Sequence, residues 1–271
     1  MPIQKSGEDD YCKFVPANYI KNKAVYPWGN NRRFNSWSDR ARQLYGSRLQ
    51  KLTVNAGFSC PNRDGTILTG GCSFCNNRGF NPSYCDPEKP ISQQIDEGLE
   101  LVRKRYPRAK LFVAYLQAYS NTYAGIGKLR DIYQQALSHP DISGLVIGTR
   151  PDCVDAEKLD FIAALAGKYF IKLEYGVESC YDTTLKRVNR GHSFADSERA
   201  IEMTAERNIQ CSIHLIIGLP GESRQQMLDQ VNIINRLPIN TIKFHQLQIV
   251  KDTAMEGEYF EKPENFKLFD L

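Results

Sequence analysis

Four of the eight cysteines of this chain lie between Gly57 and Cys85. Three of them, Cys60, Cys72 and Cys75, have the spacing C-x11-C-x2-C. The segment is rich in Gly, Asn and Pro, which predicts a loop rather than a helix or strand. Cysteines clustered on a loop form disulfides, bind zinc or hold an iron–sulfur cluster.

Disulfides require an oxidising compartment. The first residues, MPIQKSGEDDYCKF, contain no apolar run typical of a secretory signal. No segment has the apolar length of a membrane span, so we expect a cytoplasmic chain with no membrane partner. If the cysteines are reduced, their spacing is compatible with two kinds of site. They could bind zinc through four cysteines including Cys85, or they could hold an iron–sulfur cluster.

The 271 residues are 41% hydrophobic and 24% charged, which is ordinary for a globular protein. The net charge of +4 is unevenly distributed, because residues 13–51 hold nine Lys and Arg against one acid, Asp39. Aromatic residues lie among these cations: Tyr26, Trp28, Phe34, Trp37 and Tyr45. Cations contact phosphates and rings stack on bases, so the segment suits a nucleic-acid surface. A solvated face whose aromatics cover one end of the core is the alternative.

Strands and helices are predicted to alternate along the rest of the chain. Apolar runs predict strands at 52–56, 111–117, 144–149, 170–177, 212–217 and 241–249. Helical periodicity falls between them at 91–105, 126–137, 155–168, 195–207 and 225–236. A short helix is expected at 36–45, ended by Gly46, and no clear element is expected in the polar tail up to Leu271.

Alternating strands and helices indicate an α/β fold with a parallel sheet. Right-handed crossovers with helices on one side give a partial (β/α)6 TIM-like barrel, while a two-sided doubly wound sheet is the alternative. We assign residues 1–50 to a basic, aromatic N-terminal extension and residues 51–250 to the core. Residues 251–271 are a C-terminal tail, expected to begin a further C-terminal portion.

In either architecture the functional residues lie at the carboxyl ends of the strands. The cysteine loop follows the first strand and therefore lies at that end. Other strand ends supply candidate neighbours: Gln117, Tyr119, Asn121, Arg150, Glu174, Glu178, Gly218, Glu222, Gln246 and Gln248. Glu174 and Glu178 share one face and suit ribose hydroxyls or an amino group. Arg187 and Arg190 follow, and a guanidinium pairs well with a carboxylate.

Three motifs carry a resemblance to a known family. They are CSFCNNRGFNP at 72–82, GVES-x8-VNRGHS at 176–193 and IIGLPGE at 216–222. A three-cysteine loop with Phe74 before its last cysteine resembles the radical S-adenosylmethionine (radical SAM) superfamily. Together the motifs most closely resemble YhcC/YtqA-type proteins, and the long cysteine spacing is similar to that of the elongator catalytic subunit. The resemblance covers roughly residues 20 to 260.

The resemblance implies that Cys60, Cys72 and Cys75 bind three irons of a [4Fe-4S] cluster. The methionine amino and carboxylate groups of S-adenosylmethionine take the fourth iron, and reductive cleavage gives methionine and a 5′-deoxyadenosyl radical. Arg190 matches the arginine that holds this carboxylate in the related oxygen-independent coproporphyrinogen oxidase. The resemblance assigns adenine to Phe74 and the backbone of Ile217, Gly218 and Leu219, ribose to Glu178, and the amino group to the positions of Gln117 and Tyr119.

The resemblance also implies a reducing partner such as flavodoxin or ferredoxin. The substrate is expected to be tRNA, from the basic segment and the elongator resemblance, or else a small metabolite. A zinc-stabilised binding module is the third possibility. Cys85 is interpreted as structural, and His214 and His245 as satisfied interior histidines. Tyr115, Tyr119 and Cys153 are candidate hydrogen-atom donors, and the sequence selects none of them.

Overall fold

The computed structural model describes residues 25–77 and 81–266, and the chain divides into two compact units at Ser47. The described part of the first unit contains α2 (Trp37–Tyr45), which confirms the predicted helix. The Ser36 side chain caps its first turn by accepting a hydrogen bond from the Asp39 amide. Gly46 ends the helix at φ 67°, a left-handed conformation that glycine adopts without strain. Cys12 and the lysines of residues 13–23 lie outside the described residues.

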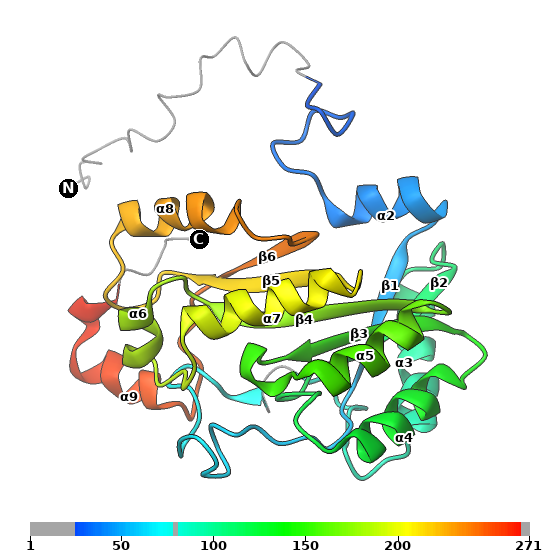
Figure 1. Ribbon diagram of the computed structural model, residues 1–271, viewed down its shortest axis with the longest axis horizontal. Coiled ribbons are helices and arrows are strands. Elements are labelled where there is room, and N and C mark those ends of the chain that lie inside the picture. The colour runs from blue at the N-terminus through cyan, green and yellow to red at the C-terminus, as the bar shows by residue number, and fades with distance from the viewer. Residues whose placement is uncertain (1–24, 78–80, 267–271) are drawn as a thin grey trace, which may run out of the picture. The chain divides into compact units, whose positions relative to one another are not determined.

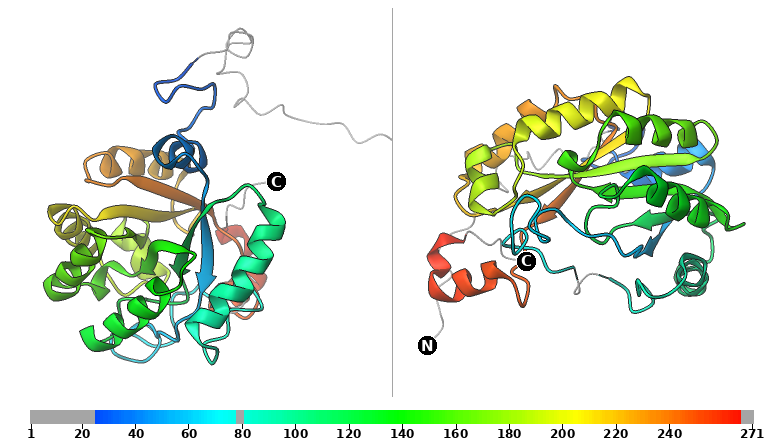
Figure 2. Two further views of the ribbon diagram at one scale, coloured as in Figure 1. Left: turned by 90° about the vertical axis from the view of Figure 1, so that its right-hand side faces the viewer. Right: turned by 60° about the horizontal axis from the view of Figure 1, so that its bottom comes forward.

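The second unit is built on six parallel strands: β1 (Leu49–Val54), β2 (Leu111–Leu116), β3 (Ile142–Thr149), β4 (Phe170–Glu178), β5 (Gln210–Ile217) and β6 (Thr241–Gln246). Their order in the sheet follows their order in the chain. Five helices connect them: α3 (Ile91–Arg105), α4 (Ile126–Leu137), α5 (Ala156–Ala166), α7 (Phe194–Glu206) and α8 (Arg224–Ile234). The sheet curls with these helices on its outer face, which confirms the partial barrel and contradicts the doubly wound alternative (Figures 1 and 2).

Alternation along each strand separates the two faces of the sheet. On β4, Leu173 and Tyr175 are fully buried in the core that the sheet shares with the helices. Lys172, Glu174 and Gly176 point to the opposite, inner face because successive side chains alternate. The outer face is therefore apolar and the inner face of the half-barrel is largely polar. No helix among the described residues is long and apolar enough to cross a membrane.

The predicted strand and helix positions are confirmed, with shifts of a few residues at their ends. The first strand begins at Leu49, inside the predicted extension, and the last ends at Gln246 rather than at 249. The helices α6 (Asp182–Arg187) and α9 (Ala254–Glu261) and the 3-10 turns η2 (Pro151–Cys153) and η3 (Pro263–Asn265) were not predicted. These elements are too short to show a helical period. The expectation of a tail without a clear element was thus wrong.

The C-terminal helix α9 contacts the cysteine loop. The Met255 amide donates to the Ser73 carbonyl at 2.9 Å, and Asn76 Nδ2 donates to the Lys251 carbonyl at 2.7 Å. Phe74 packs beside α9 against a small apolar cluster: Val188, Ile216, Leu219, Leu247, Met255 and Phe266. The loop is therefore held partly by residues from the last described part of the chain.

Candidate functional site

A cavity of about 630 Å³ opens at the carboxyl ends of the strands. Residues predicted from strand ends and from the cysteine loop line it together: Cys60, Cys72, Phe74, Cys75, Gln117, Tyr119, Arg150, Glu174, Glu178, Arg190, Gln246 and Gln248. Asn121, Gly218 and Glu222 do not line it. The curl of the sheet thus brings most of the candidate residues to one site.

The VNRG segment that follows α6 fixes the shape of the cysteine loop. The Ser73 amide donates to the Val188 carbonyl at 3.0 Å. Asn189 Nδ2 donates to the Gly71 carbonyl at 2.7 Å, and Asn62 Nδ2 donates back to the Asn189 carbonyl at 2.5 Å. These bonds replace the regular hydrogen bonding that a glycine-rich loop lacks, so two distant motifs form one rigid unit.

Arg190 lies between the cysteine loop and β4, and it is almost completely buried. Its Nη1 donates to Cys72 Sγ at 3.4 Å, and its Nη2 donates to the Gly176 carbonyl at 2.5 Å. Its Nη2 is also 3.5 Å from Glu178 Oε1. Its Nε is buried and has no hydrogen-bond partner among the described residues. A cation beside a cysteine sulfur stabilises a thiolate, and the unused donor is suited to an anionic ligand.

Arg63 supports the other side of the loop. Its Nη2 donates to the Cys75 carbonyl at 2.7 Å, and its guanidinium lies 5.6 Å from the centre of the Tyr119 ring. Burial raises the pKa of the Cys75 thiol, and nearby Cys72 adds to this, while Arg63 and Arg190 oppose it. Removing a thiol proton here therefore needs compensating positive charge, which bound iron supplies in iron–sulfur proteins.

Two lining residues other than glycine have left-handed backbone conformations. Tyr119 has φ 61° and lies three residues after β2, and Glu178 has φ 69° and is the last residue of β4. The register between β4 and β5 shifts beside Glu178, between Gly176 and Glu178. Such strained residues cluster at functional sites because the surrounding structure must hold them in place.

Cys85 lies apart from the other three loop cysteines. Its thiol donates to the Thr53 carbonyl on β1 at 3.2 Å, and it does not line the cavity. Among the described residues, no three His, Cys, Asp or Glu side chains converge on one point. Zinc requires its ligands to surround a single ion, whereas a [4Fe-4S] cluster binds its thiolates on separate irons and so accepts a wider arrangement. The arrangement disagrees with a four-cysteine zinc site.

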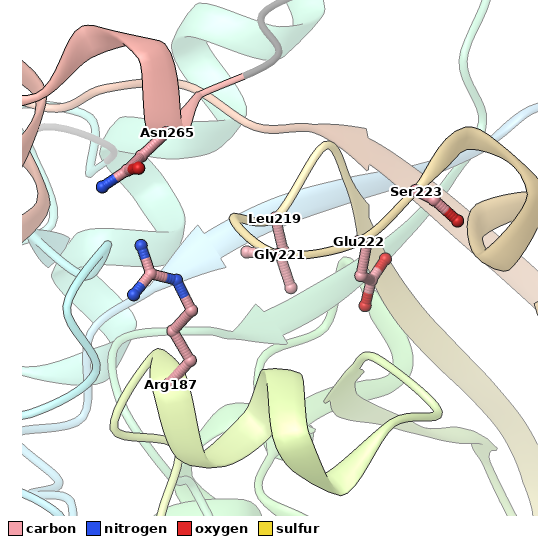
Figure 3. Close-up of a pocket in the computed structure, with 6 residues that line it drawn as sticks. All are labelled: Arg187, Leu219, Gly221, Glu222, Ser223 and Asn265. Carbon is pink, nitrogen blue, oxygen red and sulfur yellow. The ribbon is translucent and has the colours of Figure 1, made fainter.

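The segment assigned to adenine lies beside the cavity rather than on its wall. Ile216 lines the cavity, but Ile217, Gly218 and Leu219 do not. Leu219 instead faces a second pocket of about 400 Å³, lined by Arg187, Leu219, Gly221, Glu222, Ser223 and Asn265 (Figure 3). Leu219 belongs to the apolar cluster that also contains Ile216 and Leu247 and that Phe74 packs against, and these three residues line the cavity.

Two charged residues at the second pocket are already satisfied. Glu222 is buried and accepts hydrogen bonds from Ser179 Oγ at 2.5 Å and Gln230 Nε2 at 3.1 Å. Burial raises its pKa. Arg187 Nη2 pairs with Glu258 Oε1 on α9 at 2.5 Å. These contacts connect neighbouring helices and turns, so they stabilise the fold.

Glu174, one of the carboxylates predicted to suit ribose hydroxyls, lines the cavity but already has two ionic partners. Its carboxylate pairs with Lys51 Nζ at 2.5 Å and with His214 Nε2 at 3.1 Å. Burial alone would raise its pKa, but the His214 hydrogen bond and the Lys51 charge outweigh burial and hold the pKa well below its usual range. The interpretation of His214 as a satisfied interior histidine is confirmed. Cys153, a candidate hydrogen-atom donor, is buried and does not line the cavity, whereas Tyr115 and Tyr119 do.

Sequence reasoning did not identify Lys243, which lines the cavity, or Lys51 and Lys172, which lie on the same inner face without lining it. They join Glu174, His214 and His245 on the inner face of the sheet. Ionisable residues two positions apart, Lys172 and Glu174 on β4 and Lys243 and His245 on β6, are the pattern that could have revealed two of these lysines.

The comparisons with known proteins identify the family of the chain. The family model of the radical SAM superfamily matches residues 60–232, so the chain belongs to this superfamily of enzymes. Protein YhcC of Escherichia coli K12 is 42% identical over 212 residues, which cover 78% of this chain and 67% of that protein. Protein YtqA of Bacillus subtilis is 29% identical over 235 residues, which cover 86% of this chain and 73% of that protein.

A solved structure, archaeal Elp3 of Methanocaldococcus infernus with an N-terminal deletion, is similar in fold. The TM-score is 0.57 at 18% sequence identity. The match covers 82% of this chain but only half of the Elp3 chain. This similarity extends to the fold of the half-barrel and no further.

Proposed function

We propose that this radical SAM enzyme holds a [4Fe-4S] cluster on Cys60, Cys72 and Cys75 and binds S-adenosylmethionine beside it. One observation carries the proposal: the three cysteines line a single cavity together with Arg190 and Glu178. Its volume of about 630 Å³ falls within the usual range for cofactor and small-molecule sites.

The residues present fit both groups. The unused Nε of Arg190 and its contact with Cys72 Sγ suit a methionine carboxylate next to a thiolate-bound cluster. Glu178 supplies acceptor oxygens for the ribose hydroxyls, and Arg190 orients them. Phe74 and Ile216 form an apolar wall for adenine. Gln117 and Tyr119 remain the proposed contacts of the amino group.

When bound, the cluster supplies the electron for reductive cleavage of S-adenosylmethionine to methionine and a 5′-deoxyadenosyl radical. The protein binds, orients and excludes water from the reacting groups. Tyr115 is buried on the inner face, where burial and the nearby Glu174 carboxylate raise its pKa and keep it protonated. Tyr115 also lines the cavity, so a protonated hydroxyl faces the site. An external reductant such as flavodoxin or ferredoxin is the proposed electron-donating partner.

Anaerobic reconstitution tests the cluster. We expect a brown protein with about four irons per chain and formation of 5′-deoxyadenosine with a chemical reductant. Cys60→Ala, Cys72→Ala and Cys75→Ala should each lose the iron. Cys85→Ala is the matched control, because its thiol bonds to Thr53 rather than lining the cavity, and it should keep the iron. Stoichiometric zinc without iron in the anaerobic preparation would contradict the proposal.

A second candidate concerns the substrate, and the basic N-terminal segment favours it. We propose tRNA as that substrate. Within the first unit, the Tyr26 and Trp28 rings stack with centroids 4.9 Å apart. Asp39 pairs with Arg32 at 3.3 Å and with Arg42 at 2.6 Å. The shared carboxylate therefore holds Arg32, which precedes α2, close to Arg42 on the helix. Cations held close to aromatic rings are the elements that single-stranded nucleic acid contacts.

Titration of labelled tRNA at two salt concentrations tests this candidate. Reversing the charge of Arg33 should weaken binding and flatten its salt dependence, because fewer counterions are then released. Trp28→Ala should cost about 1–3 kcal/mol of binding if a base stacks there. Iron content and melting temperature should stay unchanged in both variants. Absence of binding at low salt would leave the small metabolite as the substrate.

A further inference from the structure

The connection between α3 and β2 carries a dense run of positive charge that the proposed cofactor site does not use. Residues 103–110, RKRYPRAK, end the helix and lead into the strand, and they hold five cations and no acid. Arg103 pairs with Asp141 at 2.8 Å. We group the other four cations with the arginine that precedes β1 and call this set the amino-end patch: Arg48, Lys104, Arg105, Arg108 and Lys110.

The register of the sheet brings the two ends of this patch together. β1 and β2 pair in parallel with Leu49 opposite Leu111, so Arg48 and Lys110, which directly precede these residues, lie at neighbouring strand ends. Helix α3 packs beside β1 and runs from the carboxyl ends of the strands back to their amino ends, because it connects two parallel neighbours (Figure 2). The amino-end patch therefore lies at the end of the half-barrel opposite the cavity.

Tyr106 positions two arginines of the patch at one ring. The guanidinium carbon of Arg48 lies 4.1 Å from the ring centre, and that of Arg105 lies 5.4 Å from it. The Ala109 amide donates to the Tyr106 carbonyl at 2.9 Å and closes the turn that carries the ring. An aromatic face attracts a guanidinium but has no net charge, so both arginines are held in place and their charge is not neutralised.

Most of the patch has no acidic partner in the part of the chain that the structure describes. Four of its members form no ion pair within residues 25–77 and 81–266: Arg48, Lys104, Arg105 and Arg108. Arg48 is partly exposed, and the other three side chains are exposed. Their charges are therefore available to a partner in solution.

The helix dipole explains only part of this composition. Cations in the last turn of a helix interact favourably with its dipole, which accounts for Lys104 and Arg105. Arg48 and Arg108 lie outside the helix, where the dipole gives no such benefit and the neighbouring cations repel them. An anion that carries several charges offsets this repulsion, so the patch suits a polyanionic partner.

RNA fits this patch better than an acidic electron-transfer protein does. A planar guanidinium binds two phosphate oxygens at once, and the backbone of RNA presents a phosphate at every nucleotide. An electron donor must instead approach the cysteine loop, which lies at the other end of the strands. β1 has six residues, so roughly 20 Å separates the two ends of the sheet.

We propose that the amino-end patch binds the phosphate backbone of an RNA substrate and anchors it at a distance from the cavity. This inference rests on the proposed tRNA substrate, because a small metabolite cannot contact both ends of the half-barrel. Phosphate contacts orient an RNA without reading its sequence, so the patch contributes affinity rather than specificity. The RNA reaches the cavity along β1, an edge strand of the sheet, and it must span roughly 20 Å to do so.

Titration of labelled, unfractionated tRNA into the reconstituted full chain tests the proposal. In the triple variant Lys104→Gln/Arg105→Gln/Arg108→Gln, affinity should fall about tenfold or more at about 0.1 M salt. The slope of log Kd against log salt should flatten by roughly two, since each lost phosphate contact contributes about 0.7–0.9. A matched control variant removes three exposed cations of the outer helices and their connections, and it should bind tRNA as the wild type does: Lys128→Gln/Arg199→Gln/Arg236→Gln.

Iron content and melting temperature should match the wild type in both triple variants, because the replaced side chains are exposed. If the patch variant binds tRNA as tightly as the wild type, the inference is wrong, and loss of binding in Arg33→Glu alone would then keep tRNA as the substrate. Slower reduction of the cluster by flavodoxin, with tRNA affinity unchanged, would assign the patch to an acidic protein and overturn the inference. Wild-type protein that binds no tRNA at low salt would refute the proposed substrate and the inference together.

Discussion

The buried pair of Lys51 and Glu174 gives a quantitative test of the inner face. The two side chains are 123 residues apart in sequence and meet at 2.5 Å only because the sheet curls. Replacing Lys51 with Met removes the ammonium and keeps most of the apolar stem. The Glu174 carboxylate then remains buried with His214 as its remaining partner.

The cost follows from the geometry of the pair. Removing one partner of a buried ion pair costs about 3–5 kcal/mol, since the other charge stays desolvated. Lys51 is 30% exposed, so water partly screens its contribution and we expect about 2–3 kcal/mol. Glu174→Gln should destabilise the chain similarly, by leaving the Lys51 ammonium without its acid. The double variant should be more stable than the sum of the two losses predicts, by about 1–3 kcal/mol.

The pH dependence has a defined sign. The pKa of Glu174 is lowered in the folded state, so its stabilisation is complete above the unfolded value of about 4.3 and disappears as the pH falls through the folded value. Without Lys51 the folded pKa rises, and acid unfolding should begin at a higher pH. Urea unfolding of the four proteins of the cycle between pH 3 and 8 measures both effects. Strict additivity, or an unchanged acid limb in Lys51→Met, would refute this reasoning.

Four further variants test the cofactor end of the cavity and the buried Lys172. Glu178→Ala and Arg190→Ala should each weaken binding of S-adenosylmethionine by about 1.5–3 kcal/mol in calorimetry, with iron content unchanged, because each removes a charge-assisted hydrogen bond. Unaltered affinity in both variants would mean that S-adenosylmethionine does not bind at the proposed position. Gly176→Ala should weaken the same binding, since its Cβ would collide with Glu178 Oε1 and Arg190 Nη2, whereas the control Gly127→Ala on α4 meets no atom within 4 Å and should leave it unchanged. Lys172→Met should stabilise the chain by about 1–3 kcal/mol below pH 8, because burial lowers the pKa of Lys172 in the folded state. The gain should shrink between pH 8 and about 10.4, since the unfolded wild type binds more protons than the folded one in that range and the wild type becomes more stable as the pH rises. A melting temperature equal to that of the wild type at both pH 7 and pH 10 would contradict this prediction.

The sequence was sufficient for most of the half-barrel, since period-two and period-3.6 patterns identify the six strands and the helices between them. The sequence also predicted that the cysteine loop, Glu178 and Arg190 come together, because the carboxyl ends of parallel strands share one edge of the sheet. The lysines of the inner face were missed for a physical reason. A charged residue within a strand is usually solvated, and only the curl of the sheet turns Lys51 and Lys243 toward the same inner face.

The contacts of the IIGLPGE segment show another limit of sequence reasoning. The motif places Gly218 and Leu219 next to β5, but which pocket a turn faces depends on the direction in which the chain leaves the strand. Leu219 faces the smaller pocket, whereas Ile216 and Leu247 of the same apolar cluster line the main cavity. Helix α9 was missed because its contacts with Ser73 and the loop, rather than its own periodicity, stabilise it.

The anchoring of the cysteine loop has a consequence for the biosynthesis of the protein. The three cysteines leave the ribosome early, but the residues that shape their loop, Val188, Asn189 and Met255, follow much later in the chain. Contacts between such distant residues form late, since closing long loops is entropically costly. Iron delivered to a nascent chain would therefore meet an unshaped loop. Loading of the proposed cluster is therefore expected to be a post-translational step that requires the chain to be synthesised and folded through α9.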